Sequence, residues 1–166
     1  MSKILVVDDE TTIIEVLKKL LSKHGYQVET ATEGNEALRK LKEGVFDLMI
    51  TDVRLPGGIS GLDLLRQGKE LQSHMAVIMI TAYAEIDDAV EAIKNGAFNY
   101  IAKPFKFDEL MLTIDKAMNY EITLAENEIL RKSVSTHYHF GFIVGDSPLM
   151  IEIYRLIEKV ARTNST

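Results

Sequence analysis

Up to about residue 120, short runs of apolar residues alternate with longer stretches in which apolar residues recur every three or four positions. The short runs predict buried strands, and the longer stretches predict amphipathic helices that cover them. The predicted strands are Lys3–Val7, Gln27–Thr30, Phe46–Thr51, Ala76–Thr81 and Ala97–Ala102. The predicted helices between them are Thr11–His24, Glu33–Glu43, Gly61–Leu71 and Ile86–Asn95. This alternation predicts an α/β fold, a flavodoxin-like (βα)5 doubly wound parallel sheet with strand order 2-1-3-4-5.

Glycines and one serine mark the expected ends of these helices. Gly25, Gly44 and Gly96 each follow a predicted helix, where a left-handed C-terminal cap is expected. Ser60 and Asp63 have the spacing of an N-terminal capping box, which indicates that the third helix begins directly after Ser60.

A fifth helix is expected from about Asp108, and its pattern continues to about Lys132 without Gly or Pro. Spacings of seven, three and four separate Tyr120, Asn127, Leu130 and Val134. This spacing is typical of a short two-helix seam in which an asparagine sets the register. It also fits a solvated helix with a few apolar residues, and the pattern leaves both interpretations open. Residues 121–139 are predicted to form a C-terminal helical linker.

After residue 140 the chain carries a single amphipathic stripe. Its apolar positions are Leu149, Met150, Ile153, Tyr154, Ile157 and Val160. One amphipathic helix cannot form its own core, and no other segment is patterned to cover this stripe. The stripe therefore predicts the opening of a second domain that this sequence cuts off.

Composition and charge narrow the possible classes of protein. A length of 166 residues suits one domain and an appendage. With a net charge of -6 and no cluster of Lys and Arg, the chain lacks the electrostatic footprint of a nucleic-acid binder. It has no cysteine, no apolar run of membrane-spanning length and no signal-like N-terminus, so we expect a cytoplasmic protein without a membrane partner.

Acidic residues follow two of the predicted strands at the point where each strand ends. The first strand leads directly into Asp8, Asp9 and Glu10, and the third leads into Asp52. These strands are neighbours in the predicted order, so the three aspartates are expected to converge at the carboxyl edge of the sheet. A phosphate-binding turn would have glycines there, whereas consecutive acids repel phosphate and attract a cation.

A hydroxyl and an ammonium group approach the same edge from the other side, because the fourth strand ends at Thr81 and the fifth passes into Lys103. An oxygen cluster with few ligands and room for water suits Mg²⁺, and open coordination positions suit a phosphoryl group. An aspartate could act as nucleophile and form an acyl phosphate, while Mg²⁺ and Lys103 draw charge from the transferred group. Thr81 could bond one phosphoryl oxygen.

Each of these residues also has an ordinary interpretation. An aspartate at a strand end is more often a turn residue or a helix N-cap, and Asp9 could cap the helix that begins near Thr11. A lysine before a proline, such as Lys103, is ordinarily a surface residue. The residues at several strand ends are all predicted to meet at the same edge of the sheet. The ordinary interpretation would have to hold separately at each of these strand ends, so their joint placement favours a functional site.

Four short segments carry most of these residues. They are Val7–Asp9, Ile50–Pro56, Ile80–Ala82 and Tyr100–Phe105. Together, in order and separation, they resemble the receiver domain of bacterial two-component response regulators, and the resemblance implies that residues 1–120 form such a domain. It implies that Asp52 is the phosphoacceptor, which takes a phosphoryl group from a sensor histidine kinase.

The resemblance also implies roles for the other residues at this edge. Asp9 would bind Mg²⁺ directly and Asp8 mainly through water, with Asp52 and the backbone carbonyl of Arg54 as further ligands. No other cofactor is implied.

Three residues on the last two strands and the turn that follows are implied to respond to the phosphoryl group. Lys103 would pair with it, Thr81 would move towards it, and Tyr100 would turn inward behind Thr81. A cis peptide would precede Pro104.

One position departs from the family pattern. The family usually has a glycine eight positions after the acceptor, whereas here Ser60 occupies that position and Gly61 follows it. The loop over Pro56–Ser60 is therefore one residue longer than usual, which makes its path after the third strand uncertain from sequence.

A second resemblance lies in the tail, at Phe142–Met150 and Ile157–Ala161. These segments are similar to the first residues of the AAA+ ATPase domain in sigma-54-dependent activators of the NtrC and DctD type. The sequence contains no G-x-x-x-x-G-K-S/T motif, so residues 140–166 are predicted to be the N-terminal fragment of that domain, without its ATPase part. The alternative is an unrelated amphipathic helix.

The sequence thus predicts a phosphorylation-controlled switch rather than an enzyme with turnover. The predicted partners are a sensor histidine kinase and a second copy of the chain, which would pair through the fifth helix; sigma-54 RNA polymerase and DNA would be reached only through domains absent from this chain. The first alternative is a Mg²⁺-dependent phosphohydrolase with Asp52 as nucleophile, although no paired D-x-D acid follows. The second is a flavodoxin-like electron carrier, whose flavin phosphate the acids after the first strand would repel.

Overall fold

The computed structural model describes residues 2–82 and 86–120. Its elements are β1 (Lys3–Val7), α1 (Thr11–Lys23), β2 (Gln27–Ala31), α2 (Gly34–Glu43), β3 (Leu48–Asp52), α3 (Gly61–Leu71), β4 (Ala76–Thr81), α4 (Ile86–Lys94) and β5 (Asn99–Ala102). Residues 107–120 form a further helix. No helix in this described part of the chain is long and apolar enough to span a membrane.

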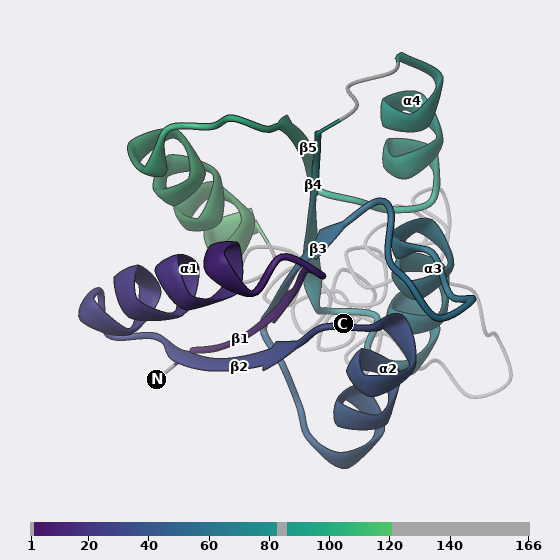
Figure 1. Cartoon of the computed structure of the whole chain (residues 1–166), viewed down its shortest axis with the longest axis horizontal. Coiled ribbons are helices and arrows are strands. Elements are labelled where there is room, and N and C mark those ends of the chain that lie inside the picture. The colour runs from purple at the N-terminus through teal and green to yellow at the C-terminus, as the bar shows by residue number, and fades with distance from the viewer. Residues whose placement is uncertain (1, 83–85, 121–166) are drawn as a thin grey trace, which may run out of the picture. The chain divides into compact units, whose positions relative to one another are not determined.

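The strands form one five-stranded parallel sheet in the order β2-β1-β3-β4-β5, which confirms the predicted topology. Figure 1 shows α1 and the 107–120 helix on one side of the sheet and α2, α3 and α4 on the other. The carboxyl ends of β1 and β3 are adjacent, because Val7 pairs with Thr51 in the ladder.

Side chains that alternate along each strand enter two separate cores. Leu5 and Val7 of β1 belong to the cluster on the side of α2, α3 and α4. Ile4 and Val6 belong to the cluster shared with α1 and the 107–120 helix. Because helices cover both faces, the central strands are continuous apolar runs and not alternating ones.

Two strands begin later than the sequence predicted. Phe46 is outside β3, since its N–H donates to the Gln72 side-chain oxygen at 2.9 Å. Ala97 is outside β5, since its N–H donates to the Ala92 carbonyl and closes the turn after α4. In both cases the backbone N–H donates to a group outside the sheet, so it is not available for a hydrogen bond to a neighbouring strand.

The predicted caps are confirmed at two glycines and wrong at the third. Gly25 and Gly96 are left-handed, with φ of 89° and 93°. Gly44 has an extended backbone, with φ of -148°. The reason is Gln72, directly after α3: its side-chain amide donates to the carbonyls of Leu41 and Gly44 and so caps the end of α2 without a left-handed turn.

The start of α3 is the capping box that the sequence predicted. Ser60 Oγ accepts the Asp63 N–H at 3.1 Å, and Asp63 Oδ2 accepts the Ser60 N–H at 3.3 Å. The loop after β3 therefore enters α3 with a fixed direction.

The chain divides into two compact units, Met1–Ile122 and Thr123–Thr166. The predicted continuation of the fifth helix to Lys132, the helical linker at 121–139 and the fragment at 140–166 all lie outside the described residues and stay predictions. Of the predicted seam only Tyr120 is described, and its ring packs against Phe98 with centroids 5.7 Å apart.

Candidate functional site

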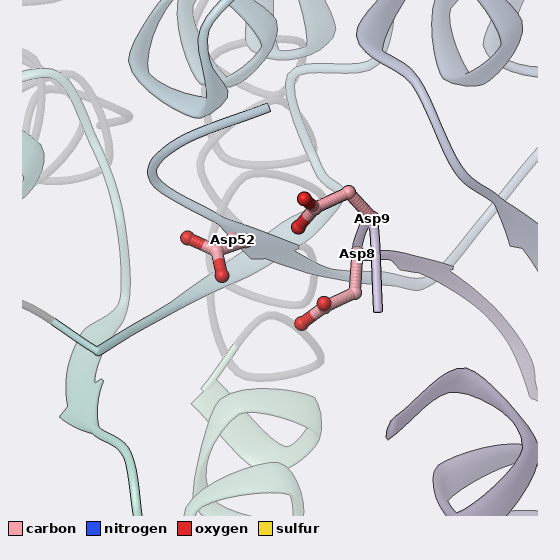
Figure 2. A group of neighbouring side chains, drawn as sticks. All are labelled: Asp8, Asp9 and Asp52. Carbon is pink, nitrogen blue, oxygen red and sulfur yellow. The ribbon is translucent and has the colours of Figure 1, made fainter. Parts of the chain in front are cut away.

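The carboxyl ends of β1 and β3 bring three aspartates together. One carboxylate oxygen from each of Asp8, Asp9 and Asp52 lies within 4.8 Å of the others, as the strand order predicted (Figure 2). Asp8 and Asp52 are buried, with 0% and 6% of their surface exposed, whereas Asp9 is exposed. The group therefore has a closed inner side and an open outer side, from which a cation or a substrate can enter.

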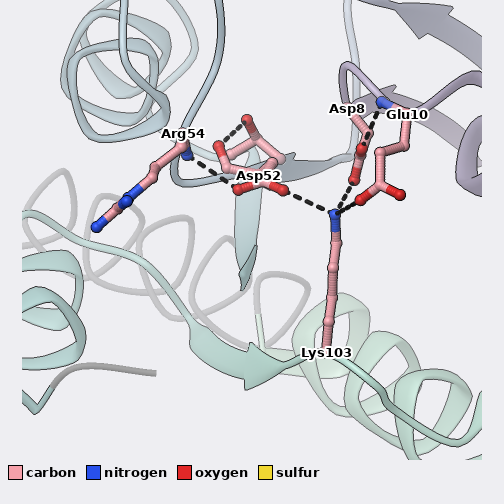
Figure 3. Close-up of polar contacts among 6 residues, drawn as sticks. Asp8, Glu10, Asp52, Arg54 and Lys103 are labelled. Atoms are coloured by element: carbon pink, nitrogen blue, oxygen red, sulfur yellow. Dashed lines mark hydrogen bonds and ion pairs between the residues drawn. The ribbon is translucent and has the colours of Figure 1, made fainter. Parts of the chain in front are cut away.

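Lys103 comes from the turn after β5 and places its ammonium among these acids (Figure 3). Its Nζ lies 2.7 Å from Asp52 Oδ2, 2.8 Å from Asp8 Oδ2 and 3.1 Å from Glu10 Oε1. The Lys103 N–H donates to the Thr81 carbonyl, which fixes this turn against β4, and the Lys103–Pro104 peptide is cis, as the resemblance implied. Lys103 is therefore the counter-charge of the acidic group.

Glu10 is a member of this site that the sequence did not predict. It follows Asp9 in the run of three acids, which was the available signal, but an exposed glutamate at the start of a helix ordinarily faces water. The Glu10 carboxylate instead lies beside Lys103, at the outer edge of the group.

Asp8 and Asp52 are held in the same way by the backbone. Asp52 Oδ1 accepts the N–H of Arg54 at 2.9 Å, and Asp8 Oδ1 accepts the N–H of Glu10 at 2.9 Å. Each buried aspartate thus uses one oxygen to bond the chain two residues on and turns the other towards Lys103. The alternative role of Asp9 as helix cap is wrong, because Glu10 occupies the N-cap of α1 and no side chain caps that end.

Burial and charge act in opposite directions on the two central groups. Burial alone lowers the pKa of Lys103, but its close contacts with the carboxylates of Asp52 and Asp8 outweigh it, so this pKa lies above the ordinary lysine value. Burial raises the pKa of Asp8, and the nearby Lys103 ammonium and the Glu10 N–H only partly oppose it. At neutral pH the lysine is therefore firmly charged, whereas burial destabilises the charged form of the Asp8 carboxylate.

The donor set fits a hard divalent cation. Asp8 Oδ2 is buried, and among the described residues no donor meets it at hydrogen-bonding geometry, although Lys103 Nζ is close. One ammonium also leaves the three aspartates with excess negative charge. Clustered carboxylate oxygens with an open side suit Mg²⁺ better than a softer metal.

The two predicted switch residues lie on β4 and β5 beside this site. Thr81 ends β4, is 1% exposed and pairs with Ala102 in the ladder. Tyr100 is half-buried on β5 and packs against the core under α2, α3 and α4. Their predicted movements towards a phosphoryl group stay predictions.

The loop after β3 contains two consecutive left-handed glycines, Gly57 and Gly58, with φ of 87° and 88°. Gly61 remains packed on the acceptor, since a Cβ there would lie 1.9 Å from the Asp52 carbonyl oxygen. Its N–H donates to the Val53 carbonyl at 2.8 Å. The inner end of the loop is therefore packed directly on Asp52, whereas its left-handed glycines lie further along it.

A parallel five-stranded sheet with three aspartates and a lysine at its carboxyl edge is the architecture of a phosphoacceptor domain. Residues 4–115 match the response regulator receiver domain, and the chain belongs to that family.

Curated relatives show the same family over nearly the whole sequence. The transcriptional regulatory protein ZraR of Klebsiella oxytoca is 38% identical over 163 residues, which are 98% of this chain and 35% of that protein. The DNA-binding transcriptional regulator NtrC of Klebsiella pneumoniae is 32% identical over 159 residues, 96% of this chain and 33% of that protein. The chain thus spans about a third of the length of these relatives.

Solved structures agree with the fold. A response regulator receiver domain protein from Clostridium thermocellum is 41% identical, with a TM-score of 0.70 over 75% of this chain and 99% of that one. The beryllofluoride-activated NtrC4 receiver domain dimer is 38% identical, with a TM-score of 0.69 over 73% of this chain and 99% of that one.

Proposed function

We propose that Asp52 is the phosphoacceptor of a two-component response regulator. The observation that carries the proposal is the position of Asp52 Oδ2, 2.7 Å from Lys103 Nζ and in one group with Asp8 and Asp9. In the transfer, a carboxylate oxygen of Asp52 attacks the phosphorus, and a P–O bond forms as the P–N bond to the kinase histidine breaks. The histidine nitrogen keeps that electron pair, and Asp52 becomes an acyl phosphate.

The residues at the site fit a Mg²⁺ ion. Asp9 would bind it directly, Asp8 mainly through water, and Asp52 and the Arg54 backbone carbonyl would complete the protein ligands. When bound, the ion neutralises negative charge on the phosphoryl oxygens. The N–H of Arg54 already orients Asp52, so the acceptor carboxylate is positioned by the chain itself.

Lys103 is the residue whose partners change most in this proposal. Its ammonium lies between Asp52 and Asp8, and phosphorylation would give it phosphoryl oxygens in place of the Asp52 carboxylate. Thr81 at the end of β4 would then approach the same group, and Tyr100 would turn inward behind it. A local change of charge would thereby favour a second arrangement of α4, β5 and the 107–120 helix.

Membership of the receiver family does not support the phosphohydrolase alternative. A switch holds its phosphoryl group, whereas a hydrolase releases phosphate over many turnovers. We therefore infer at most self-catalysed phosphotransfer and dephosphorylation at Asp52.

For the whole protein we infer a cytoplasmic regulator of sigma-54-dependent transcription. Relatives are named transcriptional regulators, and one similar receiver domain is described as a dimer. In this proposal residues 1–120 are the receiver, 121–139 a helical linker and 140–166 the start of an AAA+ domain. A sensor histidine kinase supplies the phosphoryl group, and contacts with RNA polymerase and DNA belong to domains outside this sequence.

The acceptor can be identified by chemical trapping. The chain is incubated with acetyl phosphate and Mg²⁺ and then treated with borohydride, which reduces an aspartyl phosphate to homoserine. Peptide mass mapping should find homoserine at position 52. Homoserine at Asp8 or Asp9 instead would contradict the assignment of the acceptor.

A further inference from the structure

The loop between β3 and α3 lies between the acceptor Asp52 and the first turn of α2. It begins at Val53, whose N–H donates to the Ile80 carbonyl at 3.1 Å, and it ends at the capping box of α3. Arg54 lies near its start and donates its N–H to Asp52 Oδ1. Arg54 therefore joins the start of the loop to the acceptor.

The middle of the loop is bound by the first turn of α2. The Asn35 side-chain amide donates to the Gly57 carbonyl at 3.1 Å, across 22 positions of sequence. Gly34 lies directly against the loop, since a Cβ there would be 2.8 Å from both the Cβ and the carbonyl oxygen of Ile59. The two contacts fix the middle of the loop, from Gly57 to Ile59.

These two contacts hold a segment whose backbone has unusual conformational freedom. Gly57 and Gly58 are both left-handed, and glycine loses more conformational entropy on ordering than any other residue. A loop with two such residues samples many paths unless something outside it selects one. The bond from Asn35 to Gly57 selects one path, three residues away from Arg54.

We propose that Asn35 is a positioning residue for the cation site, acting through Gly57 on the Arg54 carbonyl. The inference rests on the proposed function, in which that carbonyl is a ligand of Mg²⁺. Asn35 itself is exposed and touches neither the acid group nor the phosphoryl position. It contributes by keeping a preformed ligand in place, which reduces the entropy lost when the ion binds.

Asn35→Ala should weaken Mg²⁺ binding by roughly two- to tenfold, the range that corresponds to one ordinary hydrogen bond. The measurement is calorimetric titration of the unphosphorylated full chain with MgCl₂. In acetyl phosphate assays, the Mg²⁺ concentration that gives half the maximal phosphorylation rate should rise by the same factor. The rate at saturating Mg²⁺ should stay within about twofold of wild type, because the acceptor is unchanged.

Two variants separate this role from helix stability. Asn35→Asp cannot donate to Gly57, although an acid in the first turn favours the helix, so it should weaken Mg²⁺ binding as Asn35→Ala does. Asn95→Ala is the matched control, because the Asn95 amide donates to the Glu91 carbonyl at 2.8 Å in α4 and does not contact the loop. It should bind Mg²⁺ as wild type does.

The outcomes are distinct. If wild type binds Mg²⁺ and is phosphorylated, but both Asn35 variants bind the ion with unchanged affinity, the positioning role is wrong and the proposed function stands. If Asn35→Asp binds as wild type and only Asn35→Ala is weakened, the lost hydrogen bond to Gly57 does not explain the effect, and the positioning role is also wrong. If wild type neither binds the ion nor accepts a phosphoryl group, the proposed function fails and the inference fails with it.

Discussion

Lys103 sets one positive charge against three carboxylates, since its ammonium lies within 3.1 Å of Asp8, Asp52 and Glu10. Asp9 adds a fourth acid to the group. Such a site is costly for the folded state, because like charges repel and two of them are buried. Acids that serve the chemistry of a site can reduce the stability of the fold. Replacement of one such acid should therefore raise the free energy of unfolding.

Asp8→Asn should raise the free energy of unfolding by about 1 kcal/mol at pH 7 in Mg²⁺-free buffer. Burial raises the pKa of Asp8, so its charged form disfavours folding above that pKa. The gain should shrink as the pH falls and Asp8 becomes protonated in the folded state, and it should vanish below the ordinary aspartate pKa of about 3.9. Urea unfolding across this range tests it.

The exposed Asp108 provides the control, since Asp108→Asn removes an acid without relieving burial and should give no gain. A lower stability of Asp8→Asn at pH 7 would mean that pairing with Lys103 outweighs the burial of the carboxylate.

Lys103→Gln should have the opposite effect and lower the free energy of unfolding by about 2 kcal/mol at pH 7, because buried carboxylates lose their counter-charge. The pKa of Lys103 is raised, so its contribution is fully present below the ordinary lysine pKa of about 10.4 and is lost as the pH rises through the higher folded value. The exposed Lys106, replaced in the same way, should change stability little. Equal stability of the two variants would contradict the central position of Lys103.

The site residues that the sequence identified are those whose position follows from a strand end. Asp8, Asp9 and Asp52 are fixed by the carboxyl ends of β1 and β3, whose adjacency follows from the fold class. Glu10 was missed because its contact with Lys103 depends on the direction of an exposed side chain at the start of α1. Sequence pattern determines which face a residue occupies, but not where a long exposed side chain points.

At the scale of elements, the predicted ends of helices and strands are wrong where a residue outside the element supplies or accepts the hydrogen bonds at that end. Gly44 fits the sequence signature of a left-handed cap, but Gln72, the residue that follows α3, supplies the hydrogen bonds that such a cap would provide. Ala97 and Phe46 were assigned to strands because they are apolar, although their N–H groups bond within loops. Apolar pattern predicts burial well, and it does not distinguish a buried loop end from a strand.

Gly61→Ala should disturb the junction of β3 and α3, because the new Cβ would lie 1.9 Å from the Asp52 carbonyl oxygen. We expect a loss of about 3 kcal/mol in the free energy of unfolding, together with slower phosphorylation. Gly58→Ala is the matched control, since that position is left-handed but has open space around it and should lose only about 1 kcal/mol. Equal losses would contradict a requirement for glycine at position 61 that is set by the contact with the Asp52 carbonyl.

At the scale of the whole molecule, the strand order was predictable because it follows from an alternation of strand and helix over about 100 residues. Covering helices on both faces explain why β1, β3 and β4 consist mainly of consecutive apolar residues. Association of two chains depends on the surface of a helix and not on a buried core. The sequence pattern from Tyr120 onward therefore does not decide between a dimer seam and a solvated helix.

Deletion of the chain from Tyr120 onward should weaken self-association at least tenfold if the fifth helix forms the dimer seam. Sedimentation equilibrium of the full chain and the shortened chain measures the two constants. An unchanged constant would contradict pairing through this helix, without affecting the proposed chemistry at Asp52.

The most direct test of the central claim is the intact mass of the chain after incubation with acetyl phosphate, with and without Mg²⁺. Asp52→Asn is the control, since it keeps the size of the acceptor and removes its nucleophile. We predict a Mg²⁺-dependent gain of one phosphoryl group in the wild type and none in the variant. An unchanged mass in the wild type, or an equal gain in Asp52→Asn, would contradict the assignment of Asp52 as the phosphoacceptor.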